Sequence, residues 1–269
     1  MERIKAAVFD VDGTLFDYRE RKLHDSTVRA VRALKERGIT VVVATARSYA
    51  ELSEELLSRI GADYYVAASG QCIQDAEGRS LYSRRFSYEQ TERVRELAVR
   101  YGVGLTLKYE RYNCLYTQPE QMQRIFTNIG QPRCPSLYCP AMDRHAAELP
   151  IGFAVLGENG ARELVCRELE RYPGDYRIER YRNGIVADIY DPHTNKMTAL
   201  EQLVRRLGIR AEDCIAFGDG GNDVEMIRWA GMGVAMGNAC DELKAAADAV
   251  CGPTWEDGIA AFLSCLLQK

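Results

Sequence analysis

The sequence predicts an α/β fold in which a parallel sheet covered by helices is interrupted by an inserted α+β segment. Two observations support this fold class. Short apolar runs without polar alternation, such as Ile39 to Ala44, are typical of strands buried on both faces, and they alternate with amphipathic helical segments. From about Ser83 to Ile189 the strands become more polar, aromatic and alternating, which indicates an antiparallel sheet with one exposed face.

The first third of the chain is predicted as β-α-β-α-β. Its first helix runs from His24 to Arg37, with Asp25 or Ser26 as its N-cap and Gly38 just past its end. The remaining elements of this part are strands from Ile4 to Val11 and from Ile39 to Ala44, a helix from Tyr49 to Ile60, and a strand from Tyr64 to Ala68.

The middle and the end of the chain complete the predicted organisation. Helices are expected at Tyr88 to Tyr101, Glu120 to Ile129 and Gly160 to Tyr172, with a Pro- and Cys-containing loop at Gln131 to Pro140. Buried strands return at Cys214 to Phe217 and Gly233 to Met236. We therefore expect a core domain at residues 1–82, an inserted domain at 83–189, and the second part of the core at 190–269.

The composition is that of an ordinary globular protein, in which any bound anion is expected to contact a few local groups. The net charge of −4 and the pI near 5.6 argue against nucleic acid as a partner, because a nucleic-acid footprint needs a clustered basic excess. No apolar run is long enough to span a bilayer and no secretory segment is apparent, so we expect a cytoplasmic protein with no membrane partner. The sequence does not distinguish a monomer from a dimer.

The cysteines are expected to be free thiols. Their number, nine, is odd and they are scattered along the chain, as is usual in a reducing compartment. One group has residue types that bind zinc but lacks the usual C-x-x-C pairs, which argues against a zinc site; it consists of Cys114, Cys134, Cys139 and His145.

The chemistry is predicted to begin at the end of the first strand, in the stretch Asp10-Val11-Asp12-Gly13-Thr14. Residues i and i+2 of an extended chain point to the same side, so Asp10 and Asp12 can both face one site at the carboxyl edge of the sheet. Open parallel sheets bind ligands at that edge. Two carboxylates in an apolar segment repel each other unless a cation or protons compensate them. A solvated acidic turn is the alternative interpretation.

A second acidic cluster, Gly218-Asp219-Gly220-Gly221-Asn222-Asp223, also follows an apolar strand and begins a helix. Such a position brings carboxylates and backbone N–H groups to the same sheet edge. Hard oxygen ligands from two strand ends suit Mg²⁺, which binds through one or two carboxylates plus a substrate phosphate. We therefore expect Mg²⁺ as the cofactor and a small phosphorylated metabolite as the ligand.

Two further positions fit a phosphate. Thr45 ends the second buried strand, where its hydroxyl and nearby N–H groups, that of Ala46 included, can bind phosphate oxygens. Lys196 begins an amphipathic helix, where a cation is unfavourable against the helix dipole unless an anionic group is close. A solvated surface lysine is the alternative for Lys196.

In this order along the chain, the motif from Asp10 to Leu15, Thr45, Lys196 and the motif from Gly218 to Asp223 resemble the signature of the haloacid dehalogenase-like hydrolases. The arrangement is most similar to their Cof-type phosphatases, and the stretches from Val234 to Ala239 and from Glu242 to Asp248 are also similar to that branch. The resemblance implies a Rossmann-like parallel-sheet core with an inserted α+β cap domain of the C2 type, subtype B.

The resemblance also implies roles for these residues in a phosphoric monoester hydrolase. Asp10 is the expected nucleophile that forms an aspartyl-phosphate, Asp12 the general acid and base, and Lys196 a catalytic and phosphate-binding group. Thr45, Ala46 and Asn222 are expected to bind substrate. The expected metal ligands are Asp10, Asp12, Asp219 and Asp223, with Asp12 acting through its backbone carbonyl and Asp223 supporting either Lys196 or the metal. Sugar phosphates are the default expectation for this branch, with pyridoxal phosphate and other small phosphate esters as alternatives.

The sequence departs from the family pattern at Ala46 and Met197, where glycine is usual, and Ser69 to Cys72 lacks an asparagine often found there. Alanine keeps its N–H, so the chemistry is expected to survive. Specificity is expected from polar and aromatic residues of the cap, namely Lys108, Tyr109, Arg111, Tyr112, Arg180, Tyr181, Arg182 and Asn183. Two alternatives remain open: a phosphomutase of the phosphomannomutase type, and a non-catalytic phospho-ligand sensor.

Overall fold

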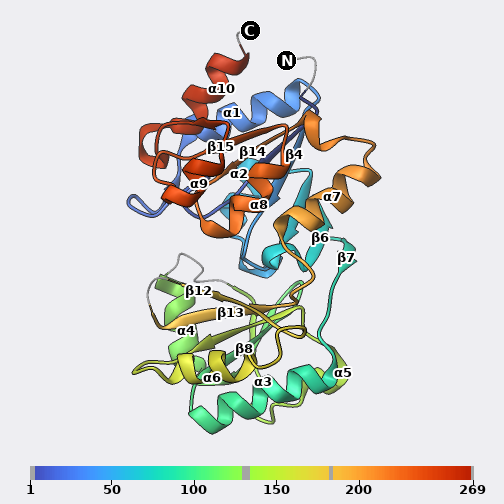
Figure 1. The fold of residues 1–269 in the computed structure, drawn as a ribbon, viewed down its shortest axis with the longest axis vertical. Helices are drawn as coiled ribbons and strands as arrows, with labels where there is room; N and C mark the ends of the chain where they lie inside the picture. The colour runs from blue at the N-terminus through green and yellow to red at the C-terminus, as the bar shows by residue number, and fades with distance from the viewer. Residues whose placement is uncertain (1–3, 129–133, 182–183, 268–269) are drawn as a thin grey trace. The chain divides into compact units, whose positions relative to one another are not determined.

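The structure, a computed structural model, describes residues 4–128, 134–181 and 184–267 (Figure 1). The chain forms two compact units. Unit 1 contains Met1–Ala46, Glu54–Leu81 and Asn195–Lys269, and unit 2 contains Arg47–Ser53 and Tyr82–Thr194. The short stretch Arg47–Ser53 thus groups with the inserted part of the chain, although it lies in the first third of the sequence.

Unit 1 is built on one sheet with the strand order β16-β15-β14-β1-β4-β5-β6-β7. Neighbouring strands are parallel from β16 to β5, and β6 pairs antiparallel with β5. The strands are β1 (Ala6–Phe9), β4 (Thr40–Ala44), β5 (Tyr64–Ala67), β6 (Cys72–Asp75), β7 (Ser80–Ser83), β14 (Cys214–Gly218), β15 (Met232–Ala235) and β16 (Ala249–Val250). A small separate hairpin pairs β2 (Phe16–Asp17) with β3 (Lys22–Leu23). The predicted α/β fold class is confirmed.

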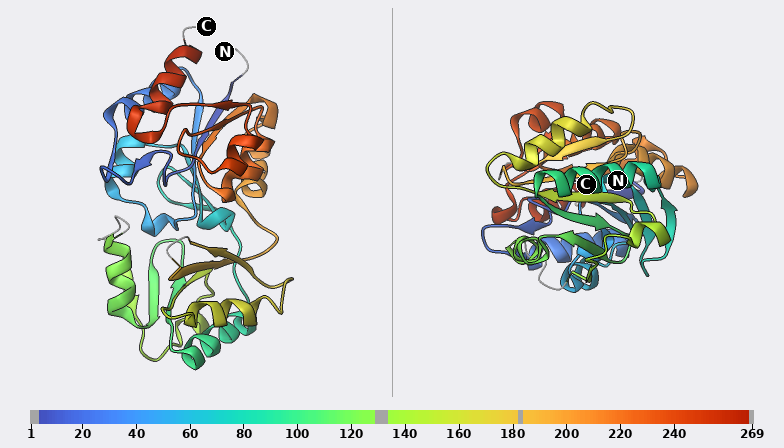
Figure 2. Two further views of the ribbon diagram at one scale, coloured as in Figure 1. Left: turned by 60° about the vertical axis from the view of Figure 1, so that its left-hand side comes forward. Right: turned by 90° about the horizontal axis from the view of Figure 1, so that it is seen from below.

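Helices cover both faces of this sheet (Figures 1 and 2). One group is α1 (Asp25–Glu36), α2 (Glu54–Ile60) and α10 (Gly258–Leu267), and the other is α7 (Lys196–Arg206), α8 (Val224–Trp229) and α9 (Asp241–Ala246). Short 3-10 turns lie at η2 (Ala68–Gly70), η3 (Ala211–Asp213), η4 (Gly221–Asp223) and η5 (Thr254–Glu256). The strand β1 is fully buried, and Phe9 stacks on Phe217 of β14 with ring centroids 5.1 Å apart. Because burial on both faces excludes polar side chains, the polar residues gather at the strand ends.

Two predicted details of unit 1 and its neighbouring segment are wrong. The helix expected from Tyr49 to Ile60 is broken into η1 (Tyr49–Glu51) and α2, with Leu52 in an extended conformation between them. The break has a local cause, since the Glu51 carboxylate accepts a 2.8 Å hydrogen bond from the Ser48 N–H and closes a single turn. The N-cap of α1 is His24, which is extended, and not one of the two residues after it.

Unit 2 contains a second sheet with the order β10-β9-β8-β11-β13-β12. Its strands are β8 (Gly104–Lys108), β9 (Asn113–Thr117), β10 (Ser136–Tyr138), β11 (Gly152–Leu156), β12 (Arg177–Arg180) and β13 (Val186–Tyr190). All pairs are antiparallel except β10 with β9, which is parallel. The loop predicted from Gln131 to Pro140 is therefore wrong at β10. Residues 129–133, which belong to the predicted helix end and loop, lie outside the described residues.

Helices lie on both faces of the unit 2 sheet and its central strands are buried, which corrects the expectation of an exposed face. Helices α3 (Tyr88–Tyr101) and α6 (Ala161–Leu169) pack on one face, with the short α5 (Arg144–Ala147) beside α3. On the other face α4 (Pro119–Asn128) packs through Met122 and Ile125 against Leu115, Leu156 and Val186. Strands β8, β11 and β13 are buried along their whole lengths. Among the described residues, no helix is both long and apolar enough to cross a membrane.

Candidate active site

Three predicted site residues follow the carboxyl ends of three adjacent strands. Asp10 follows β1, Thr45 follows β4 and Asp219 follows β14, and the sheet order places β1 between the other two. The Asp10 N–H continues the ladder by donating to the Phe217 carbonyl at 3.0 Å, and the Thr45 N–H donates to the Val66 carbonyl at 2.9 Å. The three residues are thus held on rigid backbone at one edge of the sheet, as the sequence predicts.

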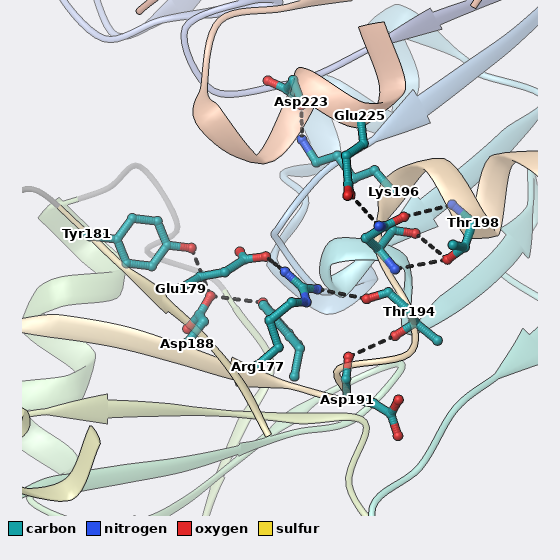
Figure 3. A network of polar contacts seen from close by, with 12 residues as sticks. Arg177, Glu179, Tyr181, Asp188, Asp191, Thr194, Lys196, Thr198, Asp223 and Glu225 are labelled. Carbon is teal, nitrogen blue, oxygen red and sulfur yellow. Dashed lines mark hydrogen bonds and ion pairs between the residues drawn. The ribbon is translucent and has the colours of Figure 1, made fainter. Parts of the chain in front are cut away.

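Lys196 is the first residue of α7 and reaches two carboxylates. Its Nζ donates to Asp10 Oδ1 at 2.7 Å and to Asp223 Oδ1 at 2.6 Å, and the lysine is 1% exposed. The helix start is fixed by Asn195, whose side chain accepts from the Thr198 N–H at 2.8 Å (Figure 3). The solvated-lysine alternative is therefore wrong, because the Nζ is buried and paired.

Asp223 links Lys196 to the second acidic motif. Its Oδ2 accepts hydrogen bonds from the Asp219 N–H at 3.2 Å and the Gly220 N–H at 3.1 Å, while its Oδ1 receives Lys196. The close approach of Asp223 requires glycine at position 218, since a Cβ there would lie 2.7 Å from the Asp223 Cβ. Asp223 therefore orients the loop that carries Asp219 and fixes the lysine.

The electrostatics of the cluster are dominated by burial. Burial raises the pKa of Asp10 well above its ordinary value, and the Asp223 carboxylate raises it further against the opposing effect of Lys196. Burial and Asp223 likewise raise the pKa of Asp219 to about 7. Burial acts to lower the pKa of Lys196, but Asp10 and Asp223 outweigh it and keep that pKa above its ordinary value. The lysine is therefore charged, and the carboxylates outnumber it.

Asp12 lies two residues beyond Asp10 in a turn that returns to Phe16 through a bridge. It is partly buried, and the Tyr18 hydroxyl donates a hydrogen bond to its Oδ1. Tyr18 is 48% exposed and follows the short strand β2. Tyr18 could not be singled out from sequence, because its contact with Asp12 depends on how the β2–β3 hairpin folds back.

The three remaining predicted residues differ in their surroundings. The Thr45 side chain is fully buried, and the Thr45 carbonyl accepts from the Ser69 N–H at 2.9 Å, which joins the two strand ends. Ala46 follows it directly and is partly buried. Asn222 lies in η4 and is exposed. It is not a member of the buried cluster, which consists of Asp10, Lys196, Asp219 and Asp223.

Two polar residues absent from the predicted site hold its turns in place. The Asn238 Nδ2 donates to the Gly13 carbonyl at 2.8 Å and to Asp219 Oδ2 at 3.3 Å, and the Thr254 hydroxyl also donates to the Gly13 carbonyl. Asn238 follows β15, so the strand-end rule that found Asp10 and Asp219 also applied to it. Gly13 adopts φ +84°, and a Cβ on it would lie 2.2 Å from Asp219 Oδ2.

The donor set fits a hard divalent cation. One carboxylate oxygen from each of Asp10, Asp219 and Asp223 lies within 4.8 Å of the others. The pKa values of Asp10 and Asp219 are raised, so the nearby protein groups do not fully neutralise the negative charge of these two carboxylates. Oxygen ligands in such a cluster match the preference of Mg²⁺.

A second group of similar residue types has a structural explanation. Asp17, Glu20 and His24 also lie within reach of one another. Asp17 already accepts from the Arg19 N–H at 2.8 Å and contacts His24 Nε2 at 2.9 Å, so its oxygens serve the β2–β3 hairpin. We assign no metal to this group.

The predicted specificity residues separate into different environments within unit 2. Lys108 and Tyr181 both contact Asp188, whereas Tyr109 and Tyr112 stack on each other with centroids 4.6 Å apart. Arg180 pairs with Glu163 and Glu170 on the surface, and Arg111 is exposed. Arg182 and Asn183 lie outside the described residues.

Comparisons with known proteins agree on one family. A family model for haloacid dehalogenase-like hydrolases matches residues 7–263. A protein of Klebsiella pneumoniae named HMP-PP phosphatase is 28% identical, with 90% of this chain and 87% of that protein covered. A solved sugar phosphatase of HAD subclass IIB is 28% identical with a TM-score of 0.83, and the match covers 97% of this chain and 98% of that one. A haloacid dehalogenase-like hydrolase structure from Bacteroides thetaiotaomicron has a TM-score of 0.87 at 23% identity, covers 98% and 99% of the two chains, and shows the shared fold.

Proposed function

Because the chain belongs to the haloacid dehalogenase-like hydrolases, we propose that it is a magnesium-dependent phosphatase that hydrolyses small phosphate esters, with sugar phosphates as the first class to test. The observation that carries the proposal is the buried contact of Lys196 with both Asp10 and Asp223 beside Asp219. A buried lysine among an excess of carboxylates leaves the site ready for a cation and a phosphoryl group. The phosphatase names of the relatives support the same reaction class.

We propose that Asp10, Asp219 and the Asp12 backbone carbonyl hold Mg²⁺, with Asp223 close enough to contribute. The ion would neutralise charge on the phosphoryl oxygens and reduce their repulsion with the attacking carboxylate. Lys196, Thr45 and the Ala46 N–H would neutralise and orient the remaining phosphoryl oxygens, and Asn222 would contact them from the exposed side of η4.

The first chemical step uses the two aspartates of the first motif. Lys196 binds Asp10 Oδ1, which leaves Oδ2 to attack phosphorus as the bond from phosphorus to the ester oxygen breaks. Asp12 donates its proton to the departing oxygen, so the alcohol leaves neutral and the phosphoryl group is bonded to Asp10. Tyr18 orients the Asp12 carboxyl for this transfer.

The second step returns Asp10 to its starting state. Asp12, now a carboxylate, takes a proton from water as the water oxygen attacks phosphorus. The bond between phosphorus and Asp10 breaks, inorganic phosphate leaves, and Asp12 is protonated again. Dividing the hydrolysis in this way lets one carboxyl act as acid and then as base.

We further propose that unit 1 is the catalytic core and unit 2 the cap, and that the protein acts in the cytoplasm on a phosphorylated metabolite. Unit 2 is inserted between segments of unit 1, and an inserted unit can carry residues that select the substrate while the core carries the chemistry. The composition, with its small net negative charge, is suited to a small ligand and not to a polymer.

The decisive experiment is phosphate release from p-nitrophenyl phosphate and from a panel of some tens of phosphorylated metabolites, with Mg²⁺ and with a chelator. Metal-dependent release supports the proposal. Phosphoryl transfer to a second sugar that depends on a bisphosphate activator would instead indicate a phosphomutase. Tight binding of a phosphorylated compound without release would indicate a sensor, and either outcome would overturn the phosphatase assignment.

A further inference from the structure

The turn η2, which joins β5 to β6, has a strained backbone. Ala68, Ser69 and Gly70 all have positive φ, at 50°, 52° and 96°. A residue with a side chain adopts this left-handed region at a conformational cost, because its Cβ approaches the following carbonyl oxygen. Such residues persist only where the surrounding structure holds them, and in proteins they concentrate at functional sites. All three residues are buried, so the contacts around η2 show what holds the turn.

The connection between the two strands does not by itself account for this strain. Ala67 at the end of β5 pairs with Cys72 at the start of the antiparallel β6, so the loop between them has four residues. Four-residue loops of this kind are most often built around a type I turn, whose central residues have negative φ. Ala68 and Ser69 are therefore left-handed for a reason other than closing the hairpin.

One contact of η2 fixes the end of β4. The Ser69 N–H donates to the Thr45 carbonyl at 2.9 Å, and the Thr45 N–H donates to the Val66 carbonyl at 2.9 Å. Both backbone groups of Thr45 are thus bonded to the segment formed by β5 and η2. The conformation of η2 therefore determines where Thr45, a proposed phosphate-binding residue, is held.

A second contact of η2 lies at the start of α7. A Cβ on Gly70 would lie 2.1 Å from the Asn195 carbonyl oxygen and 3.1 Å from the Lys196 N. The same Asn195 carbonyl accepts the first helical hydrogen bond of α7, from the Ala199 N–H at 3.2 Å. The backbone of η2 and the backbone of the helix start are therefore in direct contact, with no room for a side chain between them.

The start of α7 is also fixed from a second direction, by the segment that begins α8. The Asn195 Nδ2 donates to the Glu225 carboxylate, and the Lys196 Nζ donates to Asp223 Oδ1 at 2.6 Å (Figure 3). The Asn195 Oδ1 accepts from the Thr198 N–H at 2.8 Å and caps the helix. The first turn of α7 therefore cannot shift toward α8 or away from it without breaking one of these contacts.

A lysine depends on such support more than other phosphate-binding groups do. Its charge lies at the end of a flexible four-carbon stem, so the position of the Nζ follows the position of the backbone that carries it. The Lys196 Nζ reaches Asp10 Oδ1 at 2.7 Å from the first residue of α7. A misplacement of about 1 Å in a reacting site costs about 100-fold in rate.

We propose that η2 and Glu225 together fix the start of α7 and so set the spacing between Thr45 and Lys196, the two side chains proposed to bind the phosphoryl oxygens. The inference rests on the proposed phosphatase function. All the residues that carry it belong to unit 1. Gly70 and Glu225 are positioning residues, because they act through the backbone and side chain of Asn195 and not on the substrate.

The test uses two variants of the full-length protein, each with a matched control. Gly70→Ala places a Cβ against the Asn195 carbonyl. Its control is Gly208→Ala, because Gly208 follows the other end of α7 with φ +67° and has nothing within 4 Å of an added Cβ. Glu225→Ala removes an exposed acceptor of Asn195, and Glu201→Ala, an exposed residue of α7, is its control.

Three quantities would be measured for each protein: kcat and KM for p-nitrophenyl phosphate, the inhibition constant of inorganic phosphate, and Tm with and without Mg²⁺. Gly70→Ala should lower kcat/KM about 100-fold relative to Gly208→Ala and weaken phosphate inhibition at least about tenfold. Glu225→Ala should weaken both about threefold relative to Glu201→Ala, since one exposed hydrogen bond contributes little. The rise in Tm with Mg²⁺ should stay as in the wild type, because Asp10 and Asp219 follow β1 and β14 and not α7.

A merely structural role would lower Tm and the response to Mg²⁺ and leave phosphate inhibition of the folded protein unchanged. That result, or equal phosphate inhibition in variant and control, would overturn the inference. If Gly70→Ala does not fold, the comparison of Glu225→Ala with Glu201→Ala decides alone. Absence of Mg²⁺-dependent phosphate release in the wild type would instead count against the phosphatase proposal itself.

Discussion

Lys196 Nζ lies 2.7 Å from Asp10 Oδ1, although the two residues are 186 positions apart in the chain. The contact exists because β1 ends at Phe9 and α7 begins at Lys196, so the strand end and the helix start face the same edge of the sheet. The pair is buried, and its lysine is shared with Asp223.

Asp10→Asn should abolish turnover. The amide has nearly the same shape but is a far weaker nucleophile, so we expect kcat to fall by at least about 10³-fold. The circular dichroism spectrum should be unchanged, because the substitution removes one of several mutually repelling carboxyls. The measurement is Mg²⁺-dependent phosphate release, and mass spectrometry of wild type trapped with substrate should show the phosphoryl group on Asp10. Substantial activity in the variant would exclude Asp10 as the nucleophile.

Tyr18→Phe should lower kcat about tenfold without changing the thermal midpoint. The variant loses one hydrogen bond to the Asp12 carboxyl, and such a bond to a charged group is worth about 1.5 kcal/mol. Because the phosphate ligands are untouched, KM should stay within about twofold. Tyr138→Phe is the control, since Tyr138 is similarly exposed at 57%. Equal kcat values for the two variants would remove Tyr18 from the mechanism.

Gly13→Ala should impair activity far more than Gly38→Ala. Both glycines have positive φ, +84° and +76°, so both substitutions carry a backbone cost of about 1 to 2 kcal/mol. Only at Gly13 does the new Cβ meet Asp219 Oδ2, at 2.2 Å, whereas nothing lies within 4 Å at Gly38. Thermal unfolding and kcat/KM of both variants separate the two effects. Similar activities would show that the position of Asp219 is not critical.

Magnesium should stabilise the protein, and Asp219→Asn should remove most of that effect. A ligand at 100 times its Kd adds about 2.7 kcal/mol to the folded state. Replacing a carboxylate of the cluster by a neutral amide weakens cation binding, so the rise in Tm with Mg²⁺ should largely disappear. Asp241→Asn, an exposed carboxylate in α9, should keep the full shift. A full Mg²⁺ shift in Asp219→Asn would place the ion elsewhere.

Asp17→Asn should destabilise the protein at neutral pH but not at strongly acidic pH. Burial acts to raise the pKa of Asp17, but hydrogen bonds from His24 and the Arg19 and Glu20 N–H groups outweigh it and lower that pKa. A lowered pKa contributes stability above the unfolded value of about 3.9, and this stability is lost as the pH falls through the folded pKa. The Tm difference between wild type and variant should therefore be constant above about pH 5 and shrink below about pH 4. A difference independent of pH would argue against the carboxylate as its source.

The strand-end positions could be predicted from sequence because they depend on local pattern. Asp10, Thr45 and Asp219 each follow an unbroken apolar run, and parallel strands bring such ends to one edge whatever their order in the chain. Lys196 was predicted from a similarly local signal, a cation at a helix start. The fold class followed from the same alternation of buried strands and helices.

The details that were missed depend on contacts between distant segments. The strand β10 has only three residues and lies between two prolines, so its sequence is typical of a loop. It is recognised as a strand only by its pairing with β9. Tyr18 is an ordinary polar residue until the β2–β3 hairpin places its hydroxyl against Asp12. Asn238 is different, since it follows the end of β15 and the strand-end rule could have found it. The break after Glu51 has both a local and a distant component, since one carboxylate oxygen of Glu51 accepts from the Ser48 N–H and the other accepts from Asn113, 62 positions away.

The position of Arg47–Ser53 within unit 2 has a consequence for how such proteins can be recombined. If unit 2 consisted only of Tyr82–Thr194, it could be exchanged between relatives by recombination of one continuous segment. Glu51 accepts a hydrogen bond from Asn113 and lies near Lys108. A graft without Arg47–Ser53 would therefore remove the Glu51 carboxylate from both Asn113 and Lys108. A chimaera that exchanges unit 2 must therefore exchange both Arg47–Ser53 and Tyr82–Thr194. A chimaera that exchanges only one of them would lose the contacts of Glu51 with Asn113 and Lys108.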